Sequence, residues 1–271
     1  MKRTSLLAAF AGVMACLAAA PAYAVSYTQF PRVEEIAAKA PLAFRGVVES
    51  VTSHAVPVPN ARSMPYTATT FRVVTAFRGT SPGARVTLRH LGGPFPELPN
   101  RVMVVPGLAR FSEGDEAFVF SNDRQHPFFG TSFGDLGVMR VARADGGARV
   151  VLTEDWRFLL STPVGFRQDG AACVPSSGER TTCTPTATRD SADQESDAEG
   201  ASGASGRAGG SRVTVESFEV AVRSAVARQG AIPGRPQTIS ASAAVFEAAL
   251  GAFARGDQAE VDRIFRAEGI R

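Results

Sequence analysis

Apolar and polar side chains alternate through residues 41–141, and this alternation predicts a set of short strands around one core. In the first segment Leu42, Phe44 and Val48 share one side, and Arg45 lies on the other. A period of two residues is what a strand with one buried face requires. A second segment repeats the scheme and places these side chains on one face: Phe71, Val73, Thr75 and Phe77.

Turn signals divide this stretch into separate strands. We expect strands at residues 42–53, 66–78, 85–91 and 116–121, and a hairpin of residues 136–142 with 148–153. The first three follow one another across a short turn at 79–83, so they form an antiparallel meander. Residues 54–65 contain three prolines and are expected to be a loop. Residues 92–113 are expected to be a long irregular connection with a small strand near 101–105.

Two amphipathic helices flank the strands. Residues 31–39 predict a short helix, with Pro31 in its first turn and Pro41 beyond its end. A second helix is predicted after Thr214, which is a suitable N-cap residue. One face of that helix carries these apolar side chains: Val215, Phe218, Val222 and Val226.

Two further helices are predicted near the end of the chain, with Asp257 and Glu260 as the cap signal between them. The first presents Phe246, Ala249, Leu250 and Phe253, and the second presents Val261, Ile264 and Phe265. Helices this short rarely persist alone in water, so their apolar faces must pack on something. They pack either on one another and the strands or on a partner, which includes a second copy of the chain.

The first 24 residues have the three parts of a secretory signal peptide. Lys2 and Arg3 precede an apolar run, and the small residues Ala22 and Ala24 precede the predicted cleavage site between Ala24 and Val25. The apolar run is shorter than the roughly 20 residues that a membrane-spanning helix needs. The expected location is therefore the periplasm or the extracellular space, with lipidation at Cys16 as the alternative.

The mature chain is almost neutral, which argues against a nucleic-acid binder. Of the 29 basic residues, Lys2 and Arg3 leave with the signal peptide, so 27 basic residues face 26 acidic ones. The basic residues are scattered singly among acids, as on a solvated surface, and do not form a patch that tracks phosphates. The sequence also predicts no transmembrane segment in the mature chain, and its oligomeric state stays open.

Two cysteines remain after the signal peptide is removed, Cys173 and Cys183. In an oxidising compartment such an even pair predicts one structural disulfide. A redox-active pair is the alternative, but the spacing is not that of a Cys-x-x-Cys motif. Residues 184–212 contain no large apolar side chain and predict a disordered linker.

No catalytic, cofactor or metal site is supported by its surroundings in the sequence. Ser132 stands in a Gly-x-Ser-x-Gly motif, but a strand follows it and no histidine occurs after His126. The other two histidines, His54 and His90, lie in different segments, whereas zinc ligands usually occur as closely spaced pairs. A serine hydrolase with histidine first in the chain order remains the enzymatic alternative.

Two acidic pairs and an aromatic group complete the candidate residues. Asp115–Glu116 and Glu154–Asp155 are adjacent residues that point to opposite faces of a strand, so neither pair acts jointly as acid and base. We expect them to be exposed turn residues. Phe95, Phe128 and Phe129 are the candidate contact surface, with core packing under a long loop as the alternative.

Three segments resemble secreted bacterial proteins that contain an OB-like, netrin/TIMP-like barrel: residues 41–48 (PLAFRGVV), 71–79 (FRVVTAFRG) and 111–120 (FSEGDEAFVF). The resemblance covers residues 33–141 and implies a barrel fold. Animal inhibitors with this barrel block metalloproteases through an N-terminal cysteine of the mature chain. The predicted mature chain here starts at Val25 without a cysteine, so that mechanism does not carry over.

Together these observations predict a mainly β protein with four parts. Residues 1–24 are a signal peptide, and residues 25–183 are an antiparallel OB-like barrel of five to six strands with a short N-terminal helix. Residues 184–212 are a linker, and residues 213–271 are a small helical tail. The expected function is non-enzymatic binding of another envelope or secreted protein, with a hydrolase or a structural envelope component as alternatives. The 92–113 connection and the loop at Phe128 are the first places to look for a site.

Overall fold

The computed structural model describes residues 32–58, 61–121, 131, 134–144, 147–154, 157–162, 165–176, 179–185, 211–229 and 242–267. In β10 (Gly165–Ser176) and β11 (Glu179–Pro185) it describes little beyond the backbone. The predicted signal peptide with its cleavage site at Ala24 and Val25, and residues 186–210 of the predicted linker, lie outside these ranges.

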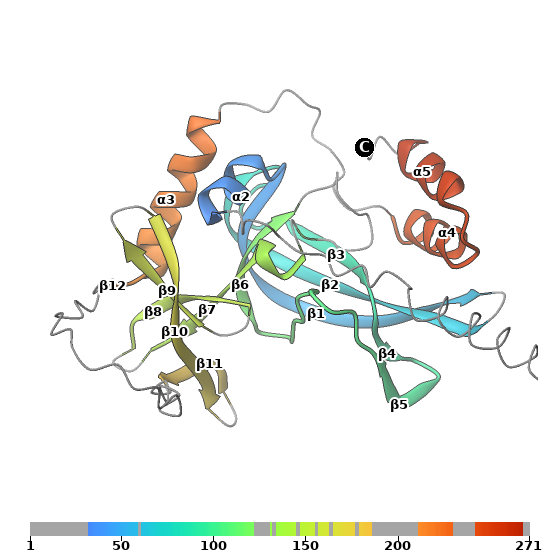
Figure 1. Cartoon of the computed structure of the whole chain (residues 1–271), viewed down its shortest axis with the longest axis horizontal. Coiled ribbons are helices and arrows are strands. Elements are labelled where there is room, and N and C mark those ends of the chain that lie inside the picture. Colours follow the sequence, from blue (N-terminus) through green and yellow to red (C-terminus); the bar gives the residue numbers. More distant parts are fainter. Residues whose placement is uncertain are drawn as a thin grey trace, which may run out of the picture. The chain divides into compact units, whose positions relative to one another are not determined.

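An antiparallel sheet with the order β3-β2-β1-β6-β7-β8 forms the centre of the protein (Figure 1). Its strands are β1 (Leu42–Val58), β2 (Ala61–Arg78), β3 (Arg85–Leu91), β6 (Glu116–Ser121), β7 (Val138–Arg143) and β8 (Arg149–Thr153). The predicted meander of the first three strands and the predicted hairpin of β7 with β8 are confirmed. Among the described strands the sheet does not close into a ring, since β3 pairs only with β2.

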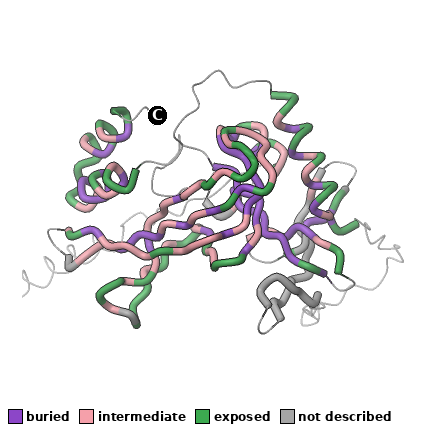
Figure 2. Tube along the Cα trace, turned by 180° about the vertical axis from the view of Figure 1, so that it is seen from behind, coloured by how far each residue is buried: buried purple, intermediate pink, exposed green. Residues whose placement is uncertain are grey.

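The order of four of these strands is that of a Greek key. Three consecutive antiparallel strands, β1 to β3, are followed by β6, which returns beside β1. A fourth strand that comes back through a long connection to lie next to the first defines this motif. The long connection contains a small hairpin of its own, β4 (Gly93–Phe95) with β5 (Leu98–Met103), which is largely exposed (Figure 2).

The regular structure beyond residue 156 is more extensive than the sequence predicted. A strand β9 (Arg157–Thr162) pairs with β8 at a single position, β10 and β11 follow as a hairpin, and β12 (Ser211–Arg212) pairs with β9. Both ends of the predicted linker, Thr184 and Arg212, therefore lie in strands. The register places Cys173 opposite Pro185 and Cys183 opposite Pro175. The two cysteine side chains are not described, so their disulfide stays a prediction.

The predicted loop at residues 54–65 is wrong, because β1 and β2 continue as one long hairpin up to Val58 and Ala61. The described prolines, Pro57 and Pro65, are accommodated without ending the pairing. Pro57 lies where the register shifts between Val56 and Val58, and proline is tolerated at such irregularities because no ladder N–H is needed there.

A bulge in β2 places Thr75 and Phe77 on the face of the sheet opposite to the predicted one. Arg45 pairs with Thr75 while Gly46 pairs with Val73, so Val74 is an extra residue in the ladder. One extra residue moves the following side chains to the other face of the sheet. Phe77 accordingly packs with the helices, opposite to Val73.

The two faces of the sheet hold different clusters. On one face the inner cluster contains Leu42, Phe44, Val48, Phe71, Val73, Leu88, Ala109, Ala117, Val119 and Val138. On the other face Phe118, Phe120 and Met139 pack under two helices, α2 (Val33–Lys39) and α3 (Val215–Arg228). The alternation along β6, with Ala117 and Val119 on one side and Phe118 and Phe120 on the other, confirms the period of two.

The remaining helices, α4 (Ala243–Ala254) and α5 (Gln258–Ala267), pack on each other and on the outer part of the β1–β2 hairpin. Phe246 lies against Tyr66, with ring centroids 5.0 Å apart. Asp257 caps α5 as predicted, because its carboxylate accepts from the Glu260 N–H at 3.0 Å. The Glu260 carboxylate accepts from Arg263. No described helix has the length and apolarity that a membrane span requires.

Candidate functional site

A cavity of about 280 Å³ lies under the connection that links β3 to β6. The β1–β3 strands contribute Val51, Thr67, His90 and Leu91 to it, and the rest of its wall comes from the connection itself. Most of the lining is apolar, and it includes Met103, Val105, Leu108, Ala109 and Phe111. A mostly apolar concavity with few polar groups is the usual form of a binding site. Most of the wall therefore lies within residues 92–113, one of the two places that the sequence marks as the first to search for a site.

Two consecutive glycines hold the first part of the connection against the sheet. Gly92 and Gly93 have φ angles of 94° and 123°, which side chains rarely allow. A Cβ atom on Gly93 would lie 2.2 Å from the hydroxyl oxygen of Thr67. That hydroxyl donates to the Gly92 carbonyl at 2.8 Å, and the Gly92 N–H donates to the Pro65 carbonyl at 2.9 Å. This wall of the cavity is therefore fixed backbone.

His90 is a polar residue of the sheet, and its imidazole lines the cavity. It lies in β3 as predicted, opposite Thr67, and its ring makes no hydrogen bond to a described residue. Burial lowers the pKa of His90 to about 4. The imidazole is therefore neutral near pH 7, with one nitrogen as donor and the other as acceptor.

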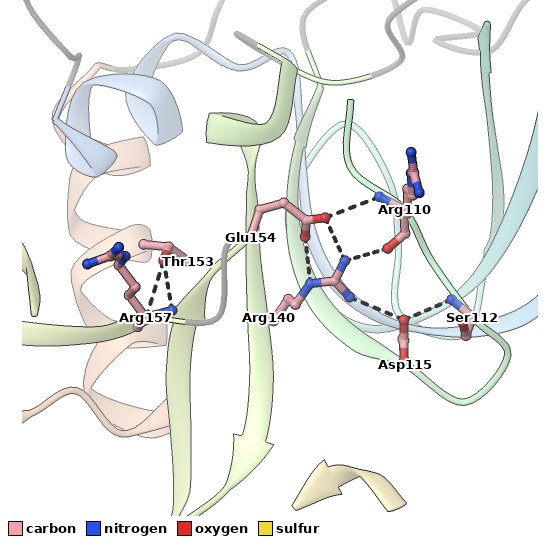
Figure 3. Close-up of polar contacts among 7 residues, drawn as sticks. All are labelled: Arg110, Ser112, Asp115, Arg140, Thr153, Glu154 and Arg157. Carbon is pink, nitrogen blue, oxygen red and sulfur yellow. Dashed lines mark hydrogen bonds and ion pairs between the residues drawn. The ribbon is translucent and has the colours of Figure 1, made fainter. Parts of the chain in front are cut away.

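A buried arginine fixes the far end of the connection (Figure 3). Arg140 of β7 is 5% exposed and pairs with Asp115 at 3.2 Å and with Glu154 at 2.5 Å. Its guanidinium also donates to the Arg110 carbonyl, and the Arg110 N–H donates to Glu154 at 3.2 Å. Asp115 accepts in addition from the Ser112 N–H at 2.8 Å.

This arginine network supports the cavity wall from behind. The Arg140 guanidinium lies 5.7 Å from the ring centroid of Phe111, which lines the cavity together with Arg110. The network thus holds residues 110–115 in place from one side, while the glycine pair holds residues 92–93 from the other. The predicted assignment of the acidic pairs as exposed turn residues is wrong for Asp115, which is 7% exposed.

A second arginine network serves the opposite face. Arg45 of β1 bonds to Glu116 of β6 and, at 2.7 Å, to Glu219 of α3. Thr75 donates to the same Glu219 oxygen at 2.8 Å. Asp115 and Glu116 therefore act on opposite faces of the sheet, as predicted. Glu116 is bound by Arg45 and Arg149 and is not free for chemistry.

The other predicted site residues are not brought together in the described part of the chain. Phe95 is half-buried in β4 and does not line the cavity. Phe128 and Phe129, like His126 and Ser132, lie outside the described residues. His54 of β1 stacks on Tyr66 of β2, with ring centroids 4.9 Å apart. Both rings lie on the face of the sheet opposite to Thr67 and the cavity. Within the described ranges, no three His, Cys, Asp or Glu side chains cluster as metal ligands.

The sequence pointed to the connection, but it did not indicate that His90 and Arg110 line a cavity there or that Arg140 supports its wall. Arg140 had a signal of its own, because it interrupts the apolar run of β7 at a position that faces the inner cluster. Comparison of the chain with protein-family models, with curated proteins and with solved structures finds no match. The function is therefore inferred from the geometry of the site.

Proposed function

We propose that this chain is a secreted or periplasmic, non-enzymatic binding protein that holds another envelope or secreted protein at the β3–β6 connection. The observation that carries the proposal is the apolar cavity of about 280 Å³ between two fixed ends of that connection. A preformed apolar pocket is where an anchor side chain of a partner gains the most from burial. The predicted signal peptide and the predicted Cys173–Cys183 disulfide fit a protein outside the cytoplasm.

The surroundings of the cavity suit a protein partner. The exposed large apolar side chains among the described residues are Val74, Val102, Val104 and Val220. Two of them, Val102 and Val104, are 54% and 57% exposed and belong to this connection. Apolar side chains beside a pocket extend the area that a partner can bury.

We also propose that the sheet is an OB-like barrel, left open in part. OB folds are five-stranded Greek-key barrels that are often partly open. The order β3-β2-β1-β6-β7, with the long connection between the third and fourth of these strands in the chain, fits such a topology. The connection at one end of the barrel then provides the binding loop.

Site-specific photo-crosslinking in native cells tests the proposed function. A benzophenone amino acid replaces Val104 beside the cavity, and the matched control replaces Val220, which is 64% exposed on α3. We expect Val104 to capture a defined protein at least about fivefold more than Val220 does, and the capture to fall in a Val105→Trp background. Equal capture at both positions, or capture that Val105→Trp leaves unchanged, would contradict the proposal.

A further inference from the structure

The chemistry of the cavity wall defines the group that the cavity can accept, and this inference rests on the proposed function. An empty apolar cavity of about 150 Å³ holds one benzene molecule. The cavity here, of about 280 Å³, therefore has room for one aromatic ring with a polar substituent, or for a two-ring indole.

The lining also excludes a charged group in the interior. His90 and Arg110 are the titratable or charged residues among those that line the cavity. Arg110 is an exposed residue, and only its backbone groups are bound by Glu154 and Arg140. A charge buried among Val51, Leu108 and Phe111 would lose its hydration without a buried counter-charge.

His90 is the side chain in the wall that is available to hydrogen-bond a ligand. The neutral imidazole offers one donor and one acceptor, so it can pair with a hydroxyl or with an indole N–H. The Thr67 hydroxyl is already engaged with the Gly92 carbonyl. The apolar wall can therefore contact a ring, and His90 can hydrogen-bond a polar tip on that ring.

We propose that the cavity takes one uncharged aromatic side chain with a polar tip, a tyrosine or a tryptophan, from the partner protein. Such side chains combine a large apolar area with one hydrogen bond, and they are enriched among the residues that dominate binding energy. The apolar residues Val102 and Val104 beside the cavity then contact the backbone and neighbours of that anchor.

Small analogues of the side chains test this assignment on the mature chain by titration calorimetry. The probes are 4-methylphenol for tyrosine, 3-methylindole for tryptophan, toluene for phenylalanine and 4-methylbenzoate as the anion. We expect 4-methylphenol and 3-methylindole to bind about fivefold more tightly than toluene, the gain of one net hydrogen bond. His90→Phe removes this preference and keeps toluene binding, while His54→Phe, on the other face, changes neither.

The outcomes separate the ligand class from the proposed function. Equal affinity for 4-methylphenol and toluene, or tightest binding of 4-methylbenzoate, overturns the polar aromatic assignment while the cavity remains a binding site. No binding of any probe, together with no capture at Val104, overturns the proposed function as well.

One competition experiment decides whether the ring belongs to a protein. Saturating 4-methylphenol should lower capture of the partner at Val104 at least about fivefold, because both occupy the same cavity. If 4-methylphenol binds and the capture is unchanged, the cavity serves a free small molecule, and the assignment to a partner side chain is wrong.

Discussion

At the residue scale, the shape of the cavity depends on a few residues that other residue types cannot replace. Gly93 has no room for a side chain, because Thr67 occupies the space where a Cβ would lie. Thr67 in turn uses its hydroxyl to hold the Gly92 carbonyl. The connection therefore starts from the sheet in one fixed direction.

Replacing Gly93 with alanine should destabilise the protein by about 3 kcal/mol, because a positive φ and a steric clash act together. The matched control is Gly107→Ala in the same connection. Gly107 also has a positive φ, 74°, but nothing lies within 4 Å of the added Cβ. Gly107→Ala should lower the free energy of unfolding by only about 1 kcal/mol, because the positive φ is the only feature there that opposes a side chain. Urea denaturation of both variants measures the difference, and equal costs would contradict the close packing on Thr67.

Arg140 is the second decisive residue. Arg140→Met leaves the buried Asp115 and the Glu154 carboxylate without their counter-charge, which should cost about 3–5 kcal/mol. Arg72→Met is the control, because Arg72 is 54% exposed and pairs with Glu49 at 3.4 Å. Exposed pairs contribute less than about 1 kcal/mol. Chemical denaturation compares the two variants, and a loss at Arg140 as small as that at Arg72 would show that the network does not hold the connection.

At the element scale, side chains of the sheet fix each helix in position. Arg78 donates to the carbonyls of Ala38 and Ala40 at the end of α2, and to the Val226 carbonyl of α3. Arg45 and Thr75 bind Glu219 from below α3. These contacts explain how α3 docks on the sheet, in addition to the apolar face that the sequence predicted.

Glu219→Ala should therefore loosen α3 and cost about 2 kcal/mol, the loss of hydrogen bonds to a charged partner. Glu216 lies on the same helix but is exposed, and Glu216→Ala should cost about 0.5 kcal/mol through the helix dipole. Amide hydrogen exchange in α3 should accelerate for Glu219→Ala and not for Glu216→Ala. Unchanged exchange in both would mean that the apolar face alone fixes the helix.

The docking of α4 on β2 should depend on pH at the alkaline end. Tyr66 donates to Glu247 at 2.6 Å, and burial together with this bond raises the pKa of Tyr66 to about 12. Its ordinary pKa is 10.0, so the unfolded chain loses this proton first as the pH rises. The stability that Tyr66 contributes is complete below pH 10 and is lost between about pH 10 and 12.

Comparison of the wild type with Tyr66→Phe over this range isolates the effect. The wild type should lose free energy of unfolding more steeply with pH than the variant, and tyrosinate absorbance should rise late. Parallel pH profiles would indicate that the Tyr66 hydroxyl is not bound to α4.

At the scale of the whole molecule, the sequence predicts the elements better than their pairing and their buried polar contacts. The period of two located β3 and β6 to the residue, and the cap signals Thr214 and Asp257 located the starts of α3 and α5. The bulge at Val74 leaves no local signal, because it arises from the pairing of β1 with β2. Arg45 looks like a solvent-facing position in the alternation, whereas Arg140 interrupts an apolar run. In both cases only the fold supplies the distant carboxylates.

The residues of the site were likewise only partly predictable from the sequence. Proline and glycine content identified residues 92–113 as a connection, but the cavity also needs Val51, Thr67 and His90 from three strands. Those residues are far apart in the chain and ordinary in type. One face of the sheet thus carries the helices, and the other carries the cavity and the arginine network that supports it.

The most direct test of the binding site is the affinity of the captured partner for three purified chains: wild type, Val105→Trp and Val104→Trp. Val105 lines the cavity and lies over Gly92, so a tryptophan there fills the space, whereas Val104 is exposed and does not line the cavity. We expect Val105→Trp to weaken binding at least about tenfold and Val104→Trp to change it less than about threefold, with all three chains equally stable. Equal affinity of wild type and Val105→Trp would show that the partner does not use the cavity.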